Sequence, residues 1–377
     1  MTEPMPIVPA VLTWARERAG YSQEAAAAKF SKIAGWERGE TAPTYPQLEK
    51  LAECFKVPVA VFFFPEPPDL PSIEQSFRTL GSEQFAAIPP RIRLLIRKAR
   101  AFQMGLEDLN RGRSQAPRLI TRDLSFDPTD DPIALAEELR NYFRISLSDQ
   151  MQWSSPTTAL QEWRKALIQV GVHVFKDQFR NSSYSGFCLY SSEFPLIYVN
   201  NSMAKTRQIF TFFHELSHLL FQTSGVDPVD DEYFTALSPH ALHIETICNR
   251  LAAQFLVPDS EFDKCISGQK IDEDLALTLA NSFCVSRELI YRKLLDRHLI
   301  SVNTYRSAAS RWNKQVKTGS GGDYYHTIIS YLGVDYINLA FRRYYQNMID
   351  DDELADYLDV KPKNLTKLEE YITRRAP

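Results

Sequence analysis

The chain has 377 residues, of which 44% are hydrophobic and 24% charged, and its formal net charge is −4. This near-neutral balance excludes a strong global attraction to nucleic acid or anionic membranes, and the length predicts roughly two to four domains. No apolar run is long enough to span a membrane, and the 5 cysteines are scattered without a Cys-x-x-Cys pair. We therefore expect a cytoplasmic protein with reduced thiols and no membrane partner.

Residues 1–75 predict a small helical module. The first helix is expected to end at Gly20, and Ser22 has the position of an N-cap for the second. The expected helices cover residues 11–19, 25–30, 33–40 and 46–55.

This module resembles an Xre/Cro-type helix-turn-helix in three blocks: Ser22-Gln23-Glu24, Trp36-Glu37-Arg38-Gly39 and Leu48-x-x-Leu51-Ala52. The resemblance implies DNA binding through the module. However, the segment before Trp36, where base-reading side chains would lie, is about one helical turn short. Acidic and basic residues also nearly cancel between positions 1 and 67, whereas phosphate binding needs clustered positive charge. A DNA-binding role and a structural or protein-docking role therefore both stay open.

Residues 76–152 predict a linker followed by a basic helical segment. Nine Arg or Lys residues and two acidic ones lie between positions 89 and 122. The apolar spacing from Ile92 to Leu109 predicts a helix that carries these charges on its outer face. That face either contacts nucleic acid or an acidic partner, or is solvated and neutralised by the acidic segment 123–152.

Residues 153–300 predict a domain built around the apolar run 210–221, which contains His214-Glu215-x-x-His218. The four-residue spacing places both imidazoles on one face of a helix, where they can bind one metal ion. Glu215 can then reach a metal-bound water without binding the metal. A buried helix could carry these residues by chance, but buried polar groups need partners, and a metal supplies them. A helix over 158–170 and strands near 172–175 and 196–199 precede the run.

A third ligand is expected from the next amphipathic helix, which we place at residues 243–257. Glu245 flanks its apolar stripe and could complete a zinc site of two His and one Glu with an open fourth position. Alternatively, Glu245 is a first-turn acid that the helix dipole favours.

Residues 180–260 resemble the ImmA/IrrE family of zinc metallopeptidases. Besides His-Glu-Leu-Ser-His, the matching blocks are Tyr184-Ser185-Gly186-Phe187-Cys188, Pro195-Leu196-Ile197-Tyr198-Val199-Asn200, Arg207-Gln208-x-Phe210-Thr211 and Glu245-x-x-Cys248-Asn249-x-x-Ala252-Ala253. The resemblance implies Zn²⁺ as cofactor, His214, His218 and Glu245 as its ligands, and Glu215 as the catalytic residue. Peptide hydrolysis also needs a group that stabilises the oxyanion. The candidates are Tyr198, Tyr233, His240 and His243.

The remaining chain predicts helices over 262–265 and 275–295, which close the metallopeptidase domain. Residues 315–323 predict a flexible linker, and helices over 324–349 and 352–372 then form a C-terminal helical domain, residues 301–377. The expected fold is therefore mainly α with a small β-sheet (α+β). It combines a helix-turn-helix module, a zincin-like metallopeptidase domain and a helical C-terminus.

Two functions from different classes follow. The family resemblance implies a regulatory protease that cleaves a helix-turn-helix repressor, either a separate protein or its own module. Fused Xre and ImmA/IrrE proteins also resemble antitoxins, so the alternative is a non-proteolytic regulator that binds a toxin and operator DNA. A homodimer is compatible with both functions.

Overall fold

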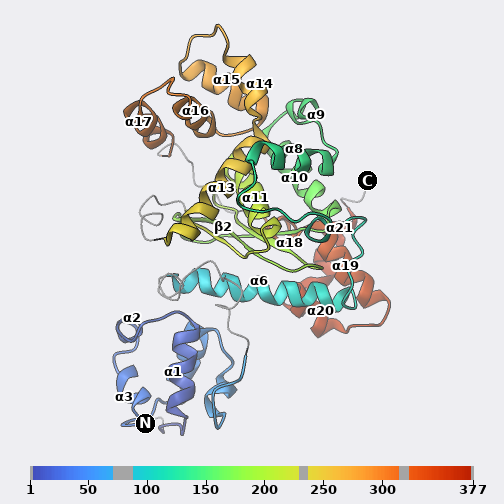
Figure 1. Ribbon diagram of the computed structural model, residues 1–377. Coiled ribbons are helices and arrows are strands. Elements are labelled where there is room, and N and C mark those ends of the chain that lie inside the picture. The colour runs from blue at the N-terminus through green and yellow to red at the C-terminus, as the bar shows by residue number, and fades with distance from the viewer. Residues whose placement is uncertain (1–2, 71–87, 229–236, 314–321, 375–377) are drawn as a thin grey trace. The chain divides into compact units, whose positions relative to one another are not determined.

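The computed structural model describes residues 3–70, 88–228, 237–313 and 322–374, which form mostly helices and one small sheet (Figure 1). The chain divides into two compact units. The first contains the described residues 3–70 and 88–98, and the second begins at Ala99. This architecture is the expected one, mainly α with a small β-sheet. No helix in the described ranges combines the length and apolar character needed to cross a bilayer.

Residues 3–70 of the first unit form four short α-helices and a 3₁₀ turn around one core. The side chain of Ser22 accepts a hydrogen bond from the amide of Ala25 at 3.1 Å, which caps the second helix as expected. Leu12, Ile33 and Phe55 are fully buried in the core. The elements are α1 (Pro9–Arg18), α2 (Gln23–Ala27), α3 (Ile33–Glu37), α4 (Tyr45–Phe55) and η1 (Val59–Phe63).

The second and third helices differ from the predicted ranges 25–30 and 33–40. Helix α2 begins at Gln23, directly after its cap, and α3 is only five residues long. Gly39 follows with a φ of +74° and turns the chain away from the helix axis. The segment between α2 and Trp36 is therefore short in the structure, as the sequence indicates.

Helix α6 (Pro90–Leu109) carries the predicted basic segment, and its first half belongs to the first unit. The guanidinium of Arg93 donates to the carbonyl of Glu17 at 3.5 Å, and that of Arg97 donates to the carbonyl of Phe55 at 3.3 Å. These carbonyls lie at the C-terminal ends of α1 and α4, where cations complement the helix dipole. Burial, with the nearby charge of Arg18, lowers the pKa of Arg97 to about 10.

The second unit is larger and is organised around a four-stranded sheet. Its strands are β1 (His173–Asp177), β2 (Tyr184–Leu189), β3 (Leu196–Asn200) and β4 (Val226–Pro228). Its helices are the second half of α6, α7 (Ile120–Asp123), α8 (Pro132–Phe143), α9 (Leu147–Met151), α10 (Pro156–Gln169), α11 (Lys205–Leu220), α13 (Pro239–Leu256), α14 (Asp259–Ile266), α15 (Glu273–Phe283), α16 (Arg287–Asp296), α17 (Val302–Asn313), α18 (Tyr324–Leu332), α19 (Val334–Tyr345), α20 (Asp351–Tyr357), η3 (Pro362–Asn364) and α21 (Leu365–Thr373).

The sheet has the strand order β1-β3-β2-β4. Strand β1 runs parallel to β3, with Phe175 opposite Tyr198, whereas β2 is antiparallel to both β3 and β4. The register between β2 and β4 shifts between Tyr184 and Gly186, which inserts Ser185 as an extra residue on β2. Within the described sheet, β4 is therefore the last strand on one side.

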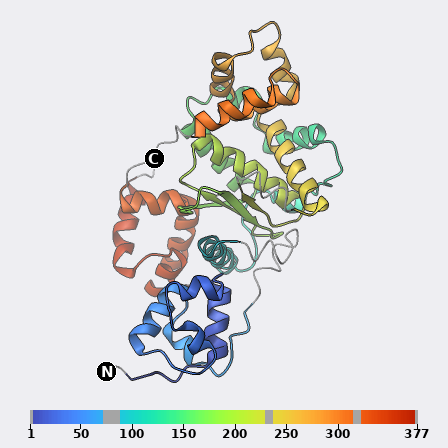
Figure 2. The same cartoon turned by 90° about the vertical axis from the view of Figure 1, so that its left-hand side faces the viewer.

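Both faces of the sheet are covered, as the fully buried strand β3 requires (Figure 2). On one face, Val174, Ile197 and Val199 belong to the same core as α10 and α11. On the other face, Phe175 stacks on Phe102 of α6 with ring centroids 4.8 Å apart. Helix α11 thus packs directly on one face of the sheet, against β2 and β3.

Three predicted helices are wrong, because each predicted range is interrupted in the structure by a residue with positive φ. The range 275–295 is two helices, α15 and α16, separated at Cys284, whose φ is +54°. The range 324–349 is divided at Gly333 with a φ of +85°, and the range 352–372 turns at Asp359 with a φ of +49°. Most of the predicted linker 315–323 lies outside the described residues.

Candidate metal centre

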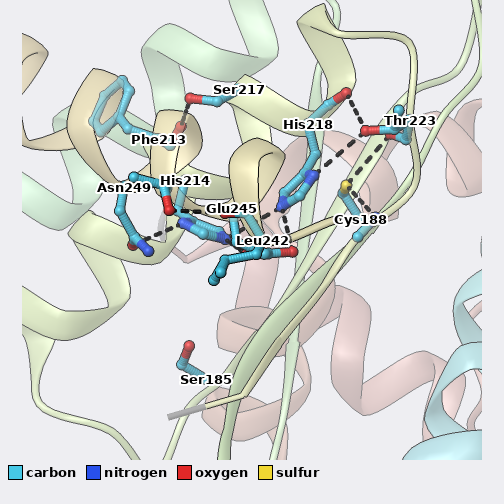
Figure 3. Close-up of polar contacts among 12 residues, drawn as sticks. Ser185, Cys188, Phe213, His214, Ser217, His218, Thr223, Leu242, Glu245 and Asn249 are labelled. Atoms are coloured by element: carbon cyan, nitrogen blue, oxygen red, sulfur yellow. Dashed lines mark hydrogen bonds and ion pairs between the residues drawn. The ribbon is translucent and has the colours of Figure 1, made fainter. Parts of the chain in front are cut away.

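Helices α11 and α13 pack side by side and bring three potential ligands together (Figure 3). His214 and His218 come from α11 and Glu245 from α13, and their ligand atoms all lie within 4.8 Å of one another. The His214 Nε2 atom is 3.2 Å from Glu245 Oε2, and the His218 Nε2 atom is 3.3 Å from Glu245 Oε1. The two Nε2 atoms are 3.3 Å apart. The predicted ligand set therefore converges on one point.

The local sequence explains this placement. Phe212, Phe213 and Leu216 are fully buried in the domain core and fix the rotation of α11, so that the two histidines face α13. Helix α13 starts at Pro239, one turn before the predicted residue 243, because Ser238 caps it by accepting a hydrogen bond from Ala241 at 3.2 Å.

The longer α13 does not fit the interpretation of Glu245 as a first-turn acid. With the helix starting at Pro239, Glu245 lies in the second turn, and the first turn contains no acidic residue. Its residue exposure is only 5%. An acid that served the helix dipole would lie in the first turn and in solvent, so this explanation does not account for Glu245.

Two polar side chains contact the Nδ1 atoms of the imidazoles, which are the ring nitrogens that face away from Glu245. Asn249 Oδ1 lies 3.1 Å from His214 Nδ1, and Thr223 Oγ1 lies 3.3 Å from His218 Nδ1. With Nδ1 engaged, each ring presents Nε2 to the centre of the site, as the supporting residues of metal-binding histidines usually arrange. Sequence reasoning identified neither support, although Asn249 stands one helical turn after Glu245.

The electrostatics favour a cation at this point. Burial raises the pKa of Glu245, but the attraction of His218 and hydrogen bonds with both histidines outweigh it, so the pKa stays well below its usual range. Glu245 is therefore a buried carboxylate between two imidazole nitrogens. Two nitrogen donors and one carboxylate oxygen are a donor set that suits Zn²⁺.

The comparisons with known families agree with this geometry. Residues 168–295 match the family described as the IrrE N-terminal-like domain, and residues 12–62 match the helix-turn-helix family. The central domain belongs to the IrrE N-terminal-like family. A search of curated proteins found no match to the chain.

In the IrrE N-terminal-like domain, Glu215 lies against β2 and is fully buried. A Cβ atom at Gly186 of β2 would be 3.7 Å from Glu215 Oε1 and only 2.5 Å from Thr211 Cγ2. The absence of a side chain at Gly186 thus lets α11 approach the sheet closely. At the first turn of α11, Arg207 donates to Ser185 Oγ at 3.3 Å, which holds the same two elements together.

The oxyanion candidates of the IrrE N-terminal-like domain lie in different places. Tyr198 stacks on Phe187 on the sheet face opposite α11, so it does not meet the site. His240 and His243 are exposed on α13, and the ring of His243 contacts the carbonyl of Pro128 at 3.2 Å. Tyr233 lies outside the described residues.

The helix-turn-helix unit is closed by a buried ion pair. Arg16 of α1 donates to Glu37 of α3 at 2.6 Å, and a second nitrogen of Arg16 donates to the carbonyl of Tyr21 at 2.8 Å. Gln23 also donates to Glu37 at 3.0 Å. These contacts bind α3 to α1 and α2, so the end of α3 serves the internal structure of the unit.

Proposed function

We propose that the chain is a zinc-dependent regulatory metallopeptidase that hydrolyses a peptide bond in a helix-turn-helix repressor or a similar partner protein. The observation that carries this proposal is the convergence of His214, His218 and Glu245 within 4.8 Å, with Glu215 beside them on the same helix. A purely structural domain has no need for three buried ligands next to a buried acid. The match to the IrrE N-terminal-like family gives independent support.

In the proposed reaction, His214, His218 and Glu245 hold the zinc ion, and Asn249 and Thr223 orient the two rings. Bound zinc supplies a Lewis acid that polarises a carbonyl and makes water more acidic. Glu215 accepts the proton of the attacking water and passes it to the leaving amine. Burial of the site keeps bulk water away from these proton transfers.

Strand β4 offers a place for the substrate. It is the last described strand on one side of the sheet and follows Gly225, where an added Cβ would be 2.7 Å from His218 Cδ2. An extended peptide can add to such an edge by main-chain hydrogen bonds, which would lay its backbone past the metal site. Recognition of this kind needs an unfolded or loop segment in the partner.

The helix-turn-helix unit favours a second candidate function. Its match to a helix-turn-helix family suggests DNA binding. The alternative is therefore a non-proteolytic antitoxin or transcriptional regulator that binds a toxin and operator DNA, with the metal domain as a scaffold.

Glu215→Gln separates the two functions, because it preserves size and hydrogen bonding but cannot accept the water's proton. The probe is a helix-turn-helix repressor encoded beside this chain's gene, incubated with the zinc-loaded full chain. We expect Glu215→Gln to lower its cleavage by about 10²–10⁴-fold while zinc content stays unchanged. Glu162→Gln, a change at a half-buried surface position on α10, is the control and should cleave normally.

The same variant tests the scaffold function. If Glu215→Gln controls its partner as well as the unchanged protein does, the peptidase proposal is wrong. A toxin gene beside this one, with neutralisation that survives Glu215→Gln, would then establish the antitoxin role.

A further inference from the structure

One exposed leucine lies beside the metal ligands and takes no part in the proposed reaction. Leu242 is on α13, three residues before Glu245 and seven before Asn249, and this spacing puts all three on one face of the helix. The rise of an α-helix separates Leu242 from Glu245 by only about 4.5 Å along the axis. Figure 3 shows Leu242 next to Glu245.

The contacts between α11 and α13 fix the end of the site at which Leu242 lies. Asn249 contacts His214, and Glu245, one turn earlier on α13, contacts His218. A step back along α13 therefore leads from His214 to His218 and then past it. Leu242 is almost one further turn back, so it lies at the His218 end of the metal site.

The side chain of Leu242 is exposed although the residues around it are buried. Its exposed fraction is 39%, whereas Ala241 and Ile244 are almost completely buried. In the part of the chain that the structure describes, Leu242 is not a member of the hydrophobic core that contains Ile244. Single exposed leucines are common on protein surfaces, but this one lies beside a site that a substrate has to reach.

The polar residues that flank Leu242 are engaged in other contacts. His243 Nε2 lies 3.2 Å from the carbonyl oxygen of Pro128, in the loop before α8. The hydroxyl of Thr246 donates to the main-chain carbonyl of Leu242 at 2.7 Å. The surface that this part of α13 offers next to Glu245 is therefore the apolar side chain of Leu242.

We propose that Leu242 is a specificity-determining residue, and that it forms an apolar subsite for a large aliphatic side chain next to the bond that is cleaved. This inference rests on the proposed function and names the kind of substrate residue that the site accepts. Strand β4 begins directly after Gly225, where an added Cβ would be 2.7 Å from His218 Cδ2. A peptide that pairs with β4 therefore passes the same end of the site as Leu242.

The chemistry of this subsite discriminates between side chains. An aliphatic side chain that packs on Leu242 removes apolar surface of both residues from water. A carboxylate in the same place would lose hydration without gaining a partner from leucine. A substrate with an acidic residue at this position should therefore bind poorly.

Binding of peptide hydroxamates tests the subsite without catalysis. The hydroxamate group binds zinc, so leucyl and aspartyl compounds of equal length present different side chains beside the same metal. With the zinc-loaded full chain, calorimetry should give a Kd about 10-fold lower for the leucyl compound. Leu242→Lys should reverse this preference, because its ammonium attracts the carboxylate, and Leu242→Ala should weaken binding of the leucyl compound alone.

Leu277→Lys is the matched control, because it makes the same change at an exposed leucine on α15. It should keep the preference of the unchanged protein. The zinc content of every variant is measured beside the Kd, and it should be the same in all of them.

Cleavage tests the same subsite in the reaction. Mass spectrometry of the products of the repressor locates the cleaved bond, and we expect a large aliphatic residue beside it. Replacing that residue with Asp should lower kcat/KM by about 10–100-fold for the unchanged protein. Leu242→Lys should recover part of this loss, which a merely structural role of Leu242 would not explain.

The outcomes are distinguishable. Equal affinity of the zinc-loaded chain for both hydroxamates, no binding of either, or a leucyl preference that survives in Leu242→Lys overturns the subsite. If the hydroxamates show the expected preference and its reversal but no repressor is cleaved, the proposed protease function is wrong and the subsite stands.

Discussion

At the scale of single residues, the metal site depends on three ligands from two helices and on the residues that orient them. His214 and Glu245 lie 3.2 Å apart and share one metal position, so removal of either leaves too few protein ligands for tight binding. We expect His214→Ala and Glu245→Ala to weaken zinc binding by at least about 100-fold, and Asn249→Ala by about 10–100-fold. Chelator competition on the full chain measures these affinities.

Glu215→Gln is the control for zinc binding, because Glu215 is not a predicted ligand and its variant should bind zinc normally. Undiminished zinc affinity in Glu245→Ala would remove Glu245 from the ligand set. Equal losses in Glu245→Ala and Glu215→Gln would instead indicate a general unfolding of the site.

A second prediction concerns Lys176 on β1. The exposed fraction of this residue is only 6%. Its ammonium lies 5.9 Å from the ring centre of Phe212. Burial lowers its pKa well below the usual value, and the charges of Arg164 and Lys205 lower it further. The unfolded chain keeps this proton up to about pH 10.4, whereas burial in the folded chain disfavours the charged amine. At neutral pH the amine therefore lowers the free energy of unfolding.

Lys176→Met should therefore raise the free energy of unfolding by about 0.5–2 kcal/mol at pH 7. The difference from the unchanged protein should shrink as the pH rises toward about 10.4, because the unfolded chain then loses the same proton. Urea unfolding at several pH values measures it. Lys165→Met, an exposed change, should show no such pH dependence, and a constant difference for Lys176→Met would contradict the prediction.

At the scale of elements, the approach of α11 to β2 depends on Gly186. A Cβ there would be 2.5 Å from Thr211 Cγ2 and 3.0 Å from the carbonyl oxygen of Tyr198, so the helix and the strand would have to separate. We expect Gly186→Ala to lower the free energy of unfolding by about 1–3 kcal/mol, as overpacking of a core does. Urea unfolding of the full chain measures this loss.

Gly322→Ala is the matched control, since a Cβ there would have only Thr327 Oγ1 nearby, at 3.8 Å. Thr211→Ser removes the methyl group that Gly186→Ala would meet, so the double variant should lose less stability than the two single losses combined. Additive losses would show that the close contact with Thr211 is not the cause.

The central elements could be predicted from the sequence because their signals are local. The spacing of His214 and His218 in an apolar run predicts a buried helix with both rings on one face, and Ser22 predicts a cap. Helix α8, which packs on α13, was not predicted, although Asp131 and Pro132 mark its start and Leu135, Leu139 and Phe143 have helical spacing. The register shift at Ser185, by contrast, depends on pairing with a distant strand. The supports Thr223 and Asn249 also depend on tertiary packing, which no local pattern contains.

Helix ends were the least predictable feature, for a physical reason. Cys284 and Asp359 adopt positive φ values, which are uncommon for residues other than glycine, although aspartate adopts them more often than most residue types. Of the three interruptions, only Gly333, also at positive φ, is a residue type that indicates a helix break in the sequence.

At the scale of the whole molecule, charge decides how strongly the helix-turn-helix unit binds DNA. Three of its positive groups serve the internal structure of the unit: Arg16 pairs with Glu37, and Arg93 and Arg97 donate to carbonyls at the ends of α1 and α4. Helix α3 has only five residues, and Ile33 and Trp36 among them are buried in the core. Few side chains remain to read base edges in a major groove.

We therefore expect the full chain to bind duplex DNA weakly, with a Kd of about 10⁻⁶ M or higher at physiological salt, and with little preference for sequence. Titration of its operator region and of a scrambled duplex, each at several salt concentrations, measures both quantities. A shallow dependence of log Kd on log salt should accompany the weak binding, because few phosphates are neutralised. Arg38→Ala serves as a comparison. Arg38 is an exposed cation directly after α3 and forms an ion pair with Glu40 at 2.6 Å. Its removal should therefore change the DNA affinity little. A nanomolar complex that prefers the operator over the scrambled duplex would show instead that the shortened unit reads sequence, and it would favour the antitoxin role.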